Sequence, residues 1–545
     1  MDASAAARRK RAARRRKAKK RCHVPRKRRP KAKRSAGYSI DAQVEAARRR
    51  RRRRRACKPK KKKRHKKKKP VVLQPVPPAP APPAPPPPPA PPFRIASPIA
   101  VYSGTFGVRQ AERLLWRAGF GPSPGHAQLL AAAGLHAAVG ALTRPSGAET
   151  LTGAAPVDGD GNPLEPNDAW GHDHLWFLDR MVRTNQPLVE RMTLVWHDWF
   201  ATSDDGVGQQ SLMLQQNALF RRHALGSFMQ LAHDVTADPA MIVWLNLDQN
   251  TRWNPNENYA RELMELFTLG ADRGAYTEND IRELAKALTG FDEDWSAELG
   301  YHNFRFVPNR WDPGNKTVFG RTGKWTWEDA ARMCVQHPMH PSFFVTKLWS
   351  YFIGAPPSAG DQSALERLYV SSGYQIRPVV EAILVHPQLY QGPRVVKPPA
   401  VFLAGMLRAL RRTIDTDAWT WLCEGAGQVL FRPPNVAGWD DNRWLDTSTV
   451  RGRWYLVNYG LEDRELDGDA LDDYDALETP AQAVANARAF WGDPDLTPET
   501  VQALTVFAAN CLPASMAGWQ QHTYRGLRQN ALRQLIYASP DLQAS

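Results

Sequence analysis

The amino-acid sequence predicts an all-α protein with a single large multi-helix domain. Beyond about residue 103, apolar residues recur three and four positions apart in most segments, and many segments begin with a capping residue. Strand patterns are nearly absent, apart from a weaker β-like segment at residues 301–319 in which aromatic residues alternate with polar ones. Long loops rich in proline and aromatic residues connect the helical segments.

A basic segment precedes the predicted helical body. Residues 1–70 contain 36 of the 74 Lys and Arg residues but only 3 of the 54 Asp and Glu residues, so their net charge is +33 against −13 for the rest. Blocks of like charge repel one another, stay unfolded and bind polyanions. We therefore predict a disordered arm at residues 1–69 that binds nucleic acid or an anionic surface polymer. Residues 70–102 form a Pro/Ala-rich polyproline linker, and residues 103–545 form the body.

Helical periodicity defines the elements of the body in chain order. The predicted helices cover residues 108–118, 125–142, 172–183, 187–202, 209–234, 239–247, 255–269, 277–288, 326–336, 341–353, 363–371, 376–385, 398–411, 449–459, 497–511 and 524–538. Between the second and third helices, Asp158, Asp160 and Asn162 have the spacing of the first ligands of a calcium loop. The sixth position is Pro163 rather than glycine and the twelfth is Ala169 rather than glutamate, which favours an ordinary turn.

The stretch at residues 254–291 has the clearest helix-boundary signals. Asn254 is a predicted N-cap, Pro255 the first helical residue and Glu257 its capping-box partner. Gly270 is expected to end this helix in the left-handed conformation, and Thr277 is expected to open the next helix. The core-facing stripes of the two helices are predicted to consist of Ala260, Leu263, Met264, Phe267, Ile281, Leu284, Ala285 and Leu288.

Polar side chains on the opposite face of the first helix form the main candidate binding site. At about 100° per residue, Asn258, Glu262 and Glu265 share one face. Paired carboxylates can act as an acid and a base, or they can bind a cation. They can equally form a structural charge network through i,i+4 pairs with an arginine. The candidate residues on this segment are Asn256, Glu257, Asn258, Arg261, Glu262 and Glu265.

Two further residues complete the candidate site. His197 lies on an otherwise apolar helix between Trp196 and Trp199, where a histidine is most often a hydrogen-bonded packing residue. The functional alternative is that His197 donates a hydrogen bond to Glu262 across a helix interface. Asp312 opens the turn D-P-G-N and is the second additional candidate.

Sugar binding is weakly indicated by aromatic loops, whereas the absence of several motifs excludes common classes of enzyme and of zinc or disulfide site. The aromatic loops at residues 311–316, 324–327 and 433–444 could stack on sugar rings, or they could fix long loops to the core. No G-x-S-x-G, Walker, dinucleotide-binding or H-E-x-x-H motif is present. The five cysteines form no C-x-x-C pair, which excludes a structural zinc ribbon and a disulfide framework. We predict no metal site and name no cofactor.

Several ordered motifs resemble the bacterial domain of unknown function 1800 family. They are R-A-G-F-G at residues 117–121, W-H-D-W-F-A-T-S at 196–203, R-R-H-A-L-G-S-F at 221–228, D-P-A-M at 238–241, N-E-N-Y-A-R-E-L-M-E-L-F-T-L-G at 256–270, P-P-N-V-A-G-W at 433–439 and A-S-P-D-L-Q at 538–543. The resemblance covers the body from about Phe106. It implies a mainly helical protein without an established activity, export in many relatives, and a sulfatase-like protein as a partner.

The chain departs from the family pattern at two positions. Relatives often carry a second histidine where this sequence has Trp199, and a histidine where Trp311 precedes Asp312. If those histidines bind a metal or carry a proton in relatives, the chain has lost both groups.

Two functions follow from the sequence. The first is a helical binding or scaffold protein tethered by its polyanion-binding arm. The alternative is a hydrolase that acts on a polar, glycan-like polymer through Glu262 and Glu265.

No run of eighteen apolar residues predicts a transmembrane helix, and no apolar segment after the first arginines predicts a signal peptide. The sequence does not assign a compartment.

Overall fold

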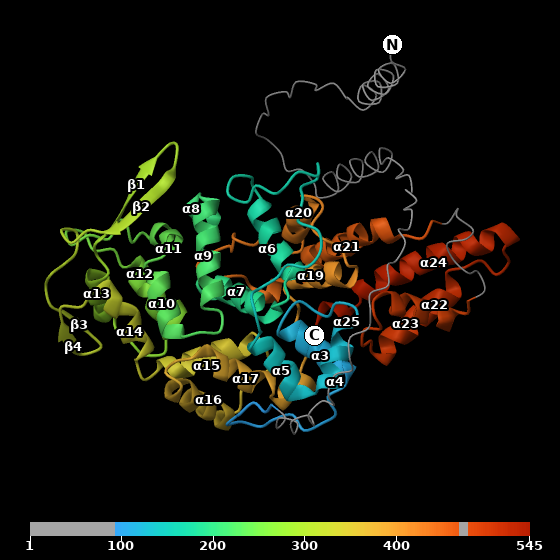
Figure 1. Cartoon of the computed structure of the whole chain (residues 1–545), viewed down its shortest axis with the longest axis horizontal. Helices are drawn as coiled ribbons and strands as arrows, with labels where there is room; N and C mark the ends of the chain where they lie inside the picture. The colour runs from blue at the N-terminus through green and yellow to red at the C-terminus, as the bar shows by residue number, and fades with distance from the viewer. Residues whose placement is uncertain (1–92, 468–477) are drawn as a thin grey trace, which may run out of the picture. The chain divides into compact units, whose positions relative to one another are not determined.

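A computed structural model of the chain describes residues 93–467 and 478–545, which lie within one compact unit, Pro91–Ser545 (Figure 1). The arm predicted at residues 1–69 and most of the predicted linker lie outside the described residues. Residues 93–102, which the sequence assigned to the linker, pack on the body. Ile95 and Ile99 are buried, and the amide of Tyr102 donates to the carbonyl of Val385 at 2.8 Å.

The described residues are mainly helical, which confirms the predicted fold class. Helices in the first half are α3 (Val108–Arg117), α4 (His126–Ala133), α5 (Leu135–Thr143), α6 (His172–Arg183), α7 (Pro187–Trp199), α8 (Asp204–Val207), α9 (Gln210–Arg222), α10 (Phe228–Thr236), α11 (Pro239–Trp244), α12 (Asn258–Glu262), the π-helix η1 (Leu263–Thr268) and α13 (Glu278–Ala287). Those in the second half are α14 (Trp327–Val335), α15 (His340–Ser350), α16 (Ala359–Ser371), α17 (Ile376–Leu384), α18 (Pro387–Gln391), α19 (Pro399–Ala409), α20 (Ala418–Gly425), η2 (Asp441–Arg443), α21 (Thr447–Leu461), η3 (Glu462–Arg464), α22 (Pro480–Phe490), α23 (Pro498–Asn510), α24 (Gly518–Ala538) and α25 (Pro540–Gln543).

Two small antiparallel hairpins lie between α13 and α14. Strands β1 (Phe291–Ser296) and β2 (Gly300–Phe306) pair with Phe291 opposite Phe306, and β3 (Lys316–Val318) pairs with β4 (Arg321–Gly323). The β-like segment predicted at residues 301–319 thus contains β2 and β3, whereas β1 carries no clear alternation and was missed. Figure 1 shows the β1–β2 hairpin projecting away from the neighbouring helices.

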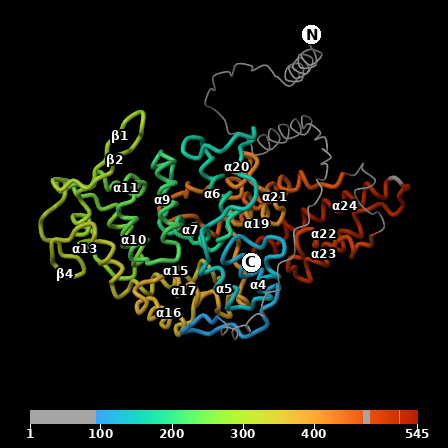
Figure 2. The backbone as a smooth tube through the Cα atoms, in the orientation of Figure 1, coloured from blue at the N-terminus to red at the C-terminus, as the bar shows by residue number. Residues whose placement is uncertain are grey.

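Helix α7 lies at the centre of the helical packing and is buried on nearly every side. It contacts α5, α6 and α9 (Figure 2). The indole nitrogen of Trp196 donates to the carbonyl of Ala224 at 3.1 Å, at the α9–α10 turn. The indole nitrogen of Trp199 donates to the carbonyl of Phe267 in η1 at 2.9 Å. A helix buried all round must satisfy polar side chains in several directions, and α7 does so through bonds to separate segments.

The segment at residues 254–270 differs from its predicted geometry. The predicted capping box is wrong, because α12 begins at Asn258 with Glu257 as its N-cap and Asn254 pairs with Thr251 in an isolated bridge. From Leu263 the helix widens into η1, where the amide of Leu269 donates to the carbonyl of Met264 five residues earlier.

Other features of this segment follow the prediction. All eight apolar residues predicted for the two core stripes are buried. Gly270 has a φ of +87°, and Thr277 forms the capping box of α13 with Asp280. The caps and stripes depend on local sequence, which explains why periodicity alone predicted them.

Some predicted helices are divided in the structure. The helix predicted at residues 125–142 is broken by Gly134, whose φ is +80°, into α4 and α5. The helix predicted at residues 209–234 is divided at Ser227, whose hydroxyl accepts from the amide of Gln230 and caps α10. Helices α8, α18, α20 and α22 were not predicted. No helix within residues 93–467 and 478–545 is long and apolar enough to cross a lipid bilayer.

Candidate functional site

The predicted carboxylate patch on α12 and η1 forms a charge network centred on Arg261. Its guanidinium lies 3.1 Å from Glu257, 3.2 Å from Glu265 and 2.8 Å from Glu278 on α13. The two hydrogen bonds to Glu278 raise the pKa of Arg261 above its usual value. One arginine thus satisfies three partly exposed carboxylates and links α12, η1 and α13, as expected for a structural network.

The two glutamates proposed as an acid–base pair have different surroundings. Glu265 binds Arg261 and also forms a hydrogen bond with the hydroxyl of Tyr276. Glu262 is half-buried and makes no hydrogen bond or ion pair within the described residues. Burial, and then the charge of Glu265, raise the pKa of Glu262. The patch therefore offers one free acid rather than two.

The remaining polar candidates bond nearby backbone groups or a neighbouring side chain. The Asn256 side chain accepts from the amide of Asn258 at 2.9 Å and so supports the start of α12. The Asn258 side chain donates to Asn246 at 2.9 Å. Asp312 accepts from the amide of Gly314 at 2.7 Å, and its carbonyl accepts from the ammonium of Lys316. These contacts are typical of loop Asn and Asp residues.

His197 packs against the loop that precedes α21 rather than against α12. Its Nε2 accepts a hydrogen bond from the amide of Phe431 at 2.9 Å, and its ring lies 5.3 Å from the Phe431 ring and 5.2 Å from that of Trp439. Burial lowers the pKa of His197 to about 3. No hydrogen bond joins His197 to Glu262 among the described residues, so the proposed donor bond is not formed.

A small cavity that the sequence did not predict lies beside α7, and we call it the Arg191 pocket. It lies between α7, the end of α15, residues 395–398 and the loop before α21. Its inner volume is about 50 Å³, and the space up to its open mouth is about 490 Å³. Its polar lining consists of Arg191, Asp198, Ser350, Tyr351, Gln428 and Asp441, and its apolar lining of Leu194, Val195, Val395, Val396, Pro398, Trp439 and Trp444.

Asp198 fixes the geometry of this pocket. It accepts from the Tyr351 hydroxyl at 2.6 Å and from the Trp439 amide at 2.9 Å. Gly438 has a φ of +93°, and a Cβ atom there would lie 2.4 Å from Oδ1 of Asp198, so only glycine allows the loop to approach so closely. Burial raises the pKa of Asp198, although these two hydrogen bonds favour its charged form.

Lys347 on α15 contacts η1 and interacts electrostatically with Asp198 of the pocket. Its ammonium donates to the carbonyl of Leu266 at 3.1 Å and lies 4.6 Å from the centre of the Trp199 ring. Burial lowers the pKa of Lys347 to about 8, and Asp198 partly opposes this shift. Trp199 thus contacts both η1 and a buried ammonium.

Two side chains of the pocket are buried with polar atoms unused. Arg191 is 7% exposed, and none of its guanidinium nitrogens makes a hydrogen bond within the described residues. Burial lowers its pKa to about 10, and the negative charge of Asp441 partly offsets that effect. Gln428 is 3% exposed, and its Oε1 accepts from the amide of Ala400, whereas its Nε2 has no partner in that part of the chain. Buried donors in native proteins nearly always have an acceptor, so the two fully buried and unbonded guanidinium nitrogens of Arg191 are available to an acceptor in the cavity.

Asp441 lies at the exposed rim of the pocket. Partial desolvation, and then the carboxylates of Asp198 and Asp440, raise its pKa to about 6. No ion pair within 4 Å joins Asp441 to Arg191 in the described residues, although the two charges interact. Arg191 and Asp441 therefore line the same pocket without forming an ion pair with each other.

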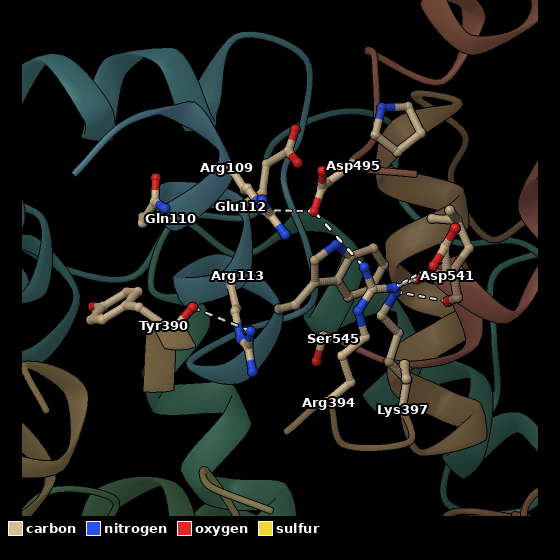
Figure 3. A pocket seen from close by; sticks show the side chains of 14 residues that line it. Arg109, Gln110, Glu112, Arg113, Tyr390, Arg394, Lys397, Asp495, Asp541 and Ser545 are labelled. Carbon is tan, nitrogen blue, oxygen red and sulfur yellow. Dashed lines mark hydrogen bonds and ion pairs between the residues drawn. The ribbon is translucent and has the colours of Figure 1, made fainter. Parts of the chain in front are cut away.

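A second cavity, beside α3, has its charges largely paired (Figure 3). Arg109 lies 2.8 Å from Asp495, and Arg394 lies 2.6 Å from Asp541. Glu112 also lines this cavity, and burial, followed by the charge of Asp495, raises its pKa to about 7. The Arg109 pair joins α3 to the segment before α23, and the Arg394 pair joins the segment after α18 to α25, which is a structural role.

The sequence contained a signal for the Arg191 pocket that periodicity did not isolate. Arg191 and Asp198 are charged residues seven positions apart on an apolar helix, and therefore on one face of it. Within W-H-D-W-F, His197 was predicted as a packing residue or a hydrogen-bond donor to Glu262, and no role was predicted for Asp198. Among the described residues, no group of three or more His, Cys, Asp or Glu side chains is arranged to hold a metal ion.

The fold and this pocket define a helical protein with a small, partly polar cavity beside its central helix. The chain belongs to the family described as protein of unknown function (DUF1800), whose model matches residues 113–544. This confirms the resemblance inferred from the motifs. No curated protein and no solved structure matched the chain.

The burial of His197 predicts a pH dependence of stability. The unfolded chain takes up a proton at this residue below about pH 6.5, whereas the folded protein resists protonation until about pH 3. The free energy of unfolding should therefore fall as the pH is lowered through this range, by up to about 1.4 kcal/mol per pH unit for this residue. His197→Gln, which retains an acceptor, should reduce that slope in urea unfolding between pH 6.5 and 4. His302→Gln on β2 is the control, and equal slopes for both variants would contradict the assignment.

Proposed function

We propose that the protein is a helical binding protein whose body holds a small polar group in the Arg191 pocket. The observation that carries this proposal is the buried Arg191 guanidinium, which faces the cavity without a hydrogen bond. An unpaired buried charge destabilises a fold by several kcal/mol, and an acceptor in the cavity would remove that penalty. The neighbouring Asp198 and Tyr351 are bonded to each other, so they position the pocket walls.

A ligand that occupies the pocket should stabilise the protein through Arg191. Acetate, inorganic phosphate, acetamide and glucose are suitable probes because each offers acceptor oxygens. At ten times its Kd, a probe should stabilise the wild type by about 1.4 kcal/mol, which corresponds to about 1 to 3 °C in Tm. Arg191→Met should abolish the shift, while the exposed Arg377→Met on α17 should retain it. Equal shifts in wild type and Arg191→Met would refute the site.

The proposed tether is the basic segment at residues 1–69. Its support is the sequence alone, in which nearly half of all Lys and Arg residues lie within the first 70 positions. Such a segment would contact phosphates or other anions of a polymer without sequence preference. The family resemblance adds a sulfatase-like protein as a proposed partner of the body.

Deletion of residues 1–69 tests the tether. The full chain should bind a mixed-sequence DNA duplex and heparin at 50 mM salt, and its affinity should fall by at least tenfold at 200 mM salt because counterion release drives the binding. The truncated chain should lose most of this affinity in a fluorescence anisotropy titration. Retention of full affinity by the truncated chain would place the polyanion site in the body.

A hydrolase acting on a polar polymer is the second candidate. Its specific support is Glu262, whose half-buried carboxyl has a raised pKa and no bonding partner in the described residues. If this acid is catalytic, Glu262→Gln should lower polysaccharide hydrolysis at least a hundredfold, as expected for the loss of a general acid. Glu257→Gln, which alters the ion pairs with Arg261 and Arg282, is the control. Equal activity in the two variants would remove the candidate.

A further inference from the structure

The polar lining of the Arg191 pocket offers donors and acceptors together. Arg191 has two buried donor nitrogens without partners in the described residues, and the side chain of Gln428 lines the same pocket. Tyr351 directs its proton to Asp198, so the Tyr351 oxygen presents a lone pair, and Asp441 presents carboxylate oxygens at the rim. A hydroxyl group both accepts and donates, so it matches this lining with one atom.

The charge balance around the pocket disfavours ionic ligands. Arg191 lies within Coulomb range of Asp441 and Asp198, and Asp198 also interacts with Lys347 on α15. An added anion would meet both carboxylates, and an added cation would meet Arg191. A neutral ligand adds no charge to this arrangement, and it can still use every polar atom that faces the cavity.

The shape of the pocket admits only one edge of a ligand. The inner volume of about 50 Å³ accommodates a few heavy atoms, while the whole empty space of about 490 Å³ includes open solvent. Most of the other lining side chains are apolar, including Trp439 and Trp444. Such walls suit the C–H faces of a ring whose hydroxyl groups lie at its edge.

We propose that the Arg191 pocket binds the edge of a neutral sugar ring, with adjacent hydroxyl groups between Arg191 and Asp441. One hydroxyl oxygen accepts from Arg191, and a neighbouring hydroxyl donates to Asp441. The side-chain amide of Gln428, which also lines the pocket, donates to the same edge. This inference names the ligand class of the proposed binding function and rests on that function.

Calorimetric titration of the full chain tests the ligand class. The probes are glucose, galactose, mannose and N-acetylglucosamine, with sodium acetate and inorganic phosphate as ionic comparators. At least one sugar should bind the wild type in the millimolar range, and Arg191→Met should weaken it at least tenfold. Removal of an unpartnered buried cation should not destabilise the fold, so this variant remains informative. Arg377→Met should bind as the wild type does.

The pH dependence provides a second readout. Asp441 is influenced by Asp198, Asp440 and Arg191, and its pKa of about 6 means that its accepting form predominates above that pH. Affinity for the sugar should rise about tenfold from pH 5 to pH 7, in proportion to ionised Asp441. Asp441→Asn should remove this pH dependence.

The outcomes separate the two proposals. Arg191-dependent binding of acetate or phosphate without sugar binding would overturn the sugar inference and support the binding function. Failure of every probe to bind, or equal binding by wild type and Arg191→Met, would overturn both.

Discussion

Four consecutive side chains of α7 form the hydrogen bonds on which the rest of the structure depends. Trp196 bonds the α9–α10 turn, His197 bonds the backbone at Phe431, Asp198 bonds Tyr351 and the backbone at Trp439, and Trp199 bonds η1. Successive helical residues point about 100° apart, so four of them cover the whole circumference. Each bond satisfies a buried polar group and also fixes the position of a separate segment. The pocket lies where two of these segments meet.

The geometry of η1 depends on the same helix. The carbonyls of Leu266 and Phe267 accept from Lys347 and from Trp199. Both carbonyls lie in the last turn of the helix, where they have no intrahelical partner. The donors from α7 and α15 therefore satisfy the C-terminal carbonyls of η1.

Local sequence predicted the parts of the molecule that local forces determine. Helical stripes, the capping box at Thr277 and the left-handed Gly270 all depend on residues within a few positions. The π turn was not predicted, because the spacing of the apolar residues in this segment also fits a regular α-helix. The function of the arginines could not be predicted either. Arg261 and Arg191 both lie on amphipathic or apolar helices, but only packing shows that three carboxylates surround the first and none bonds the second.

A π turn has one residue more than the α turn it replaces. Loss of one residue between Leu263 and Thr268 would let a continuous α-helix form and would rotate the following residues by about 100°. The carbonyl that now meets the Trp199 indole would then point elsewhere. The extra residue thus sets the rotation of the residues after η1 relative to those before it. A chain of this family without it would need a different side chain at position 199 to satisfy the buried backbone.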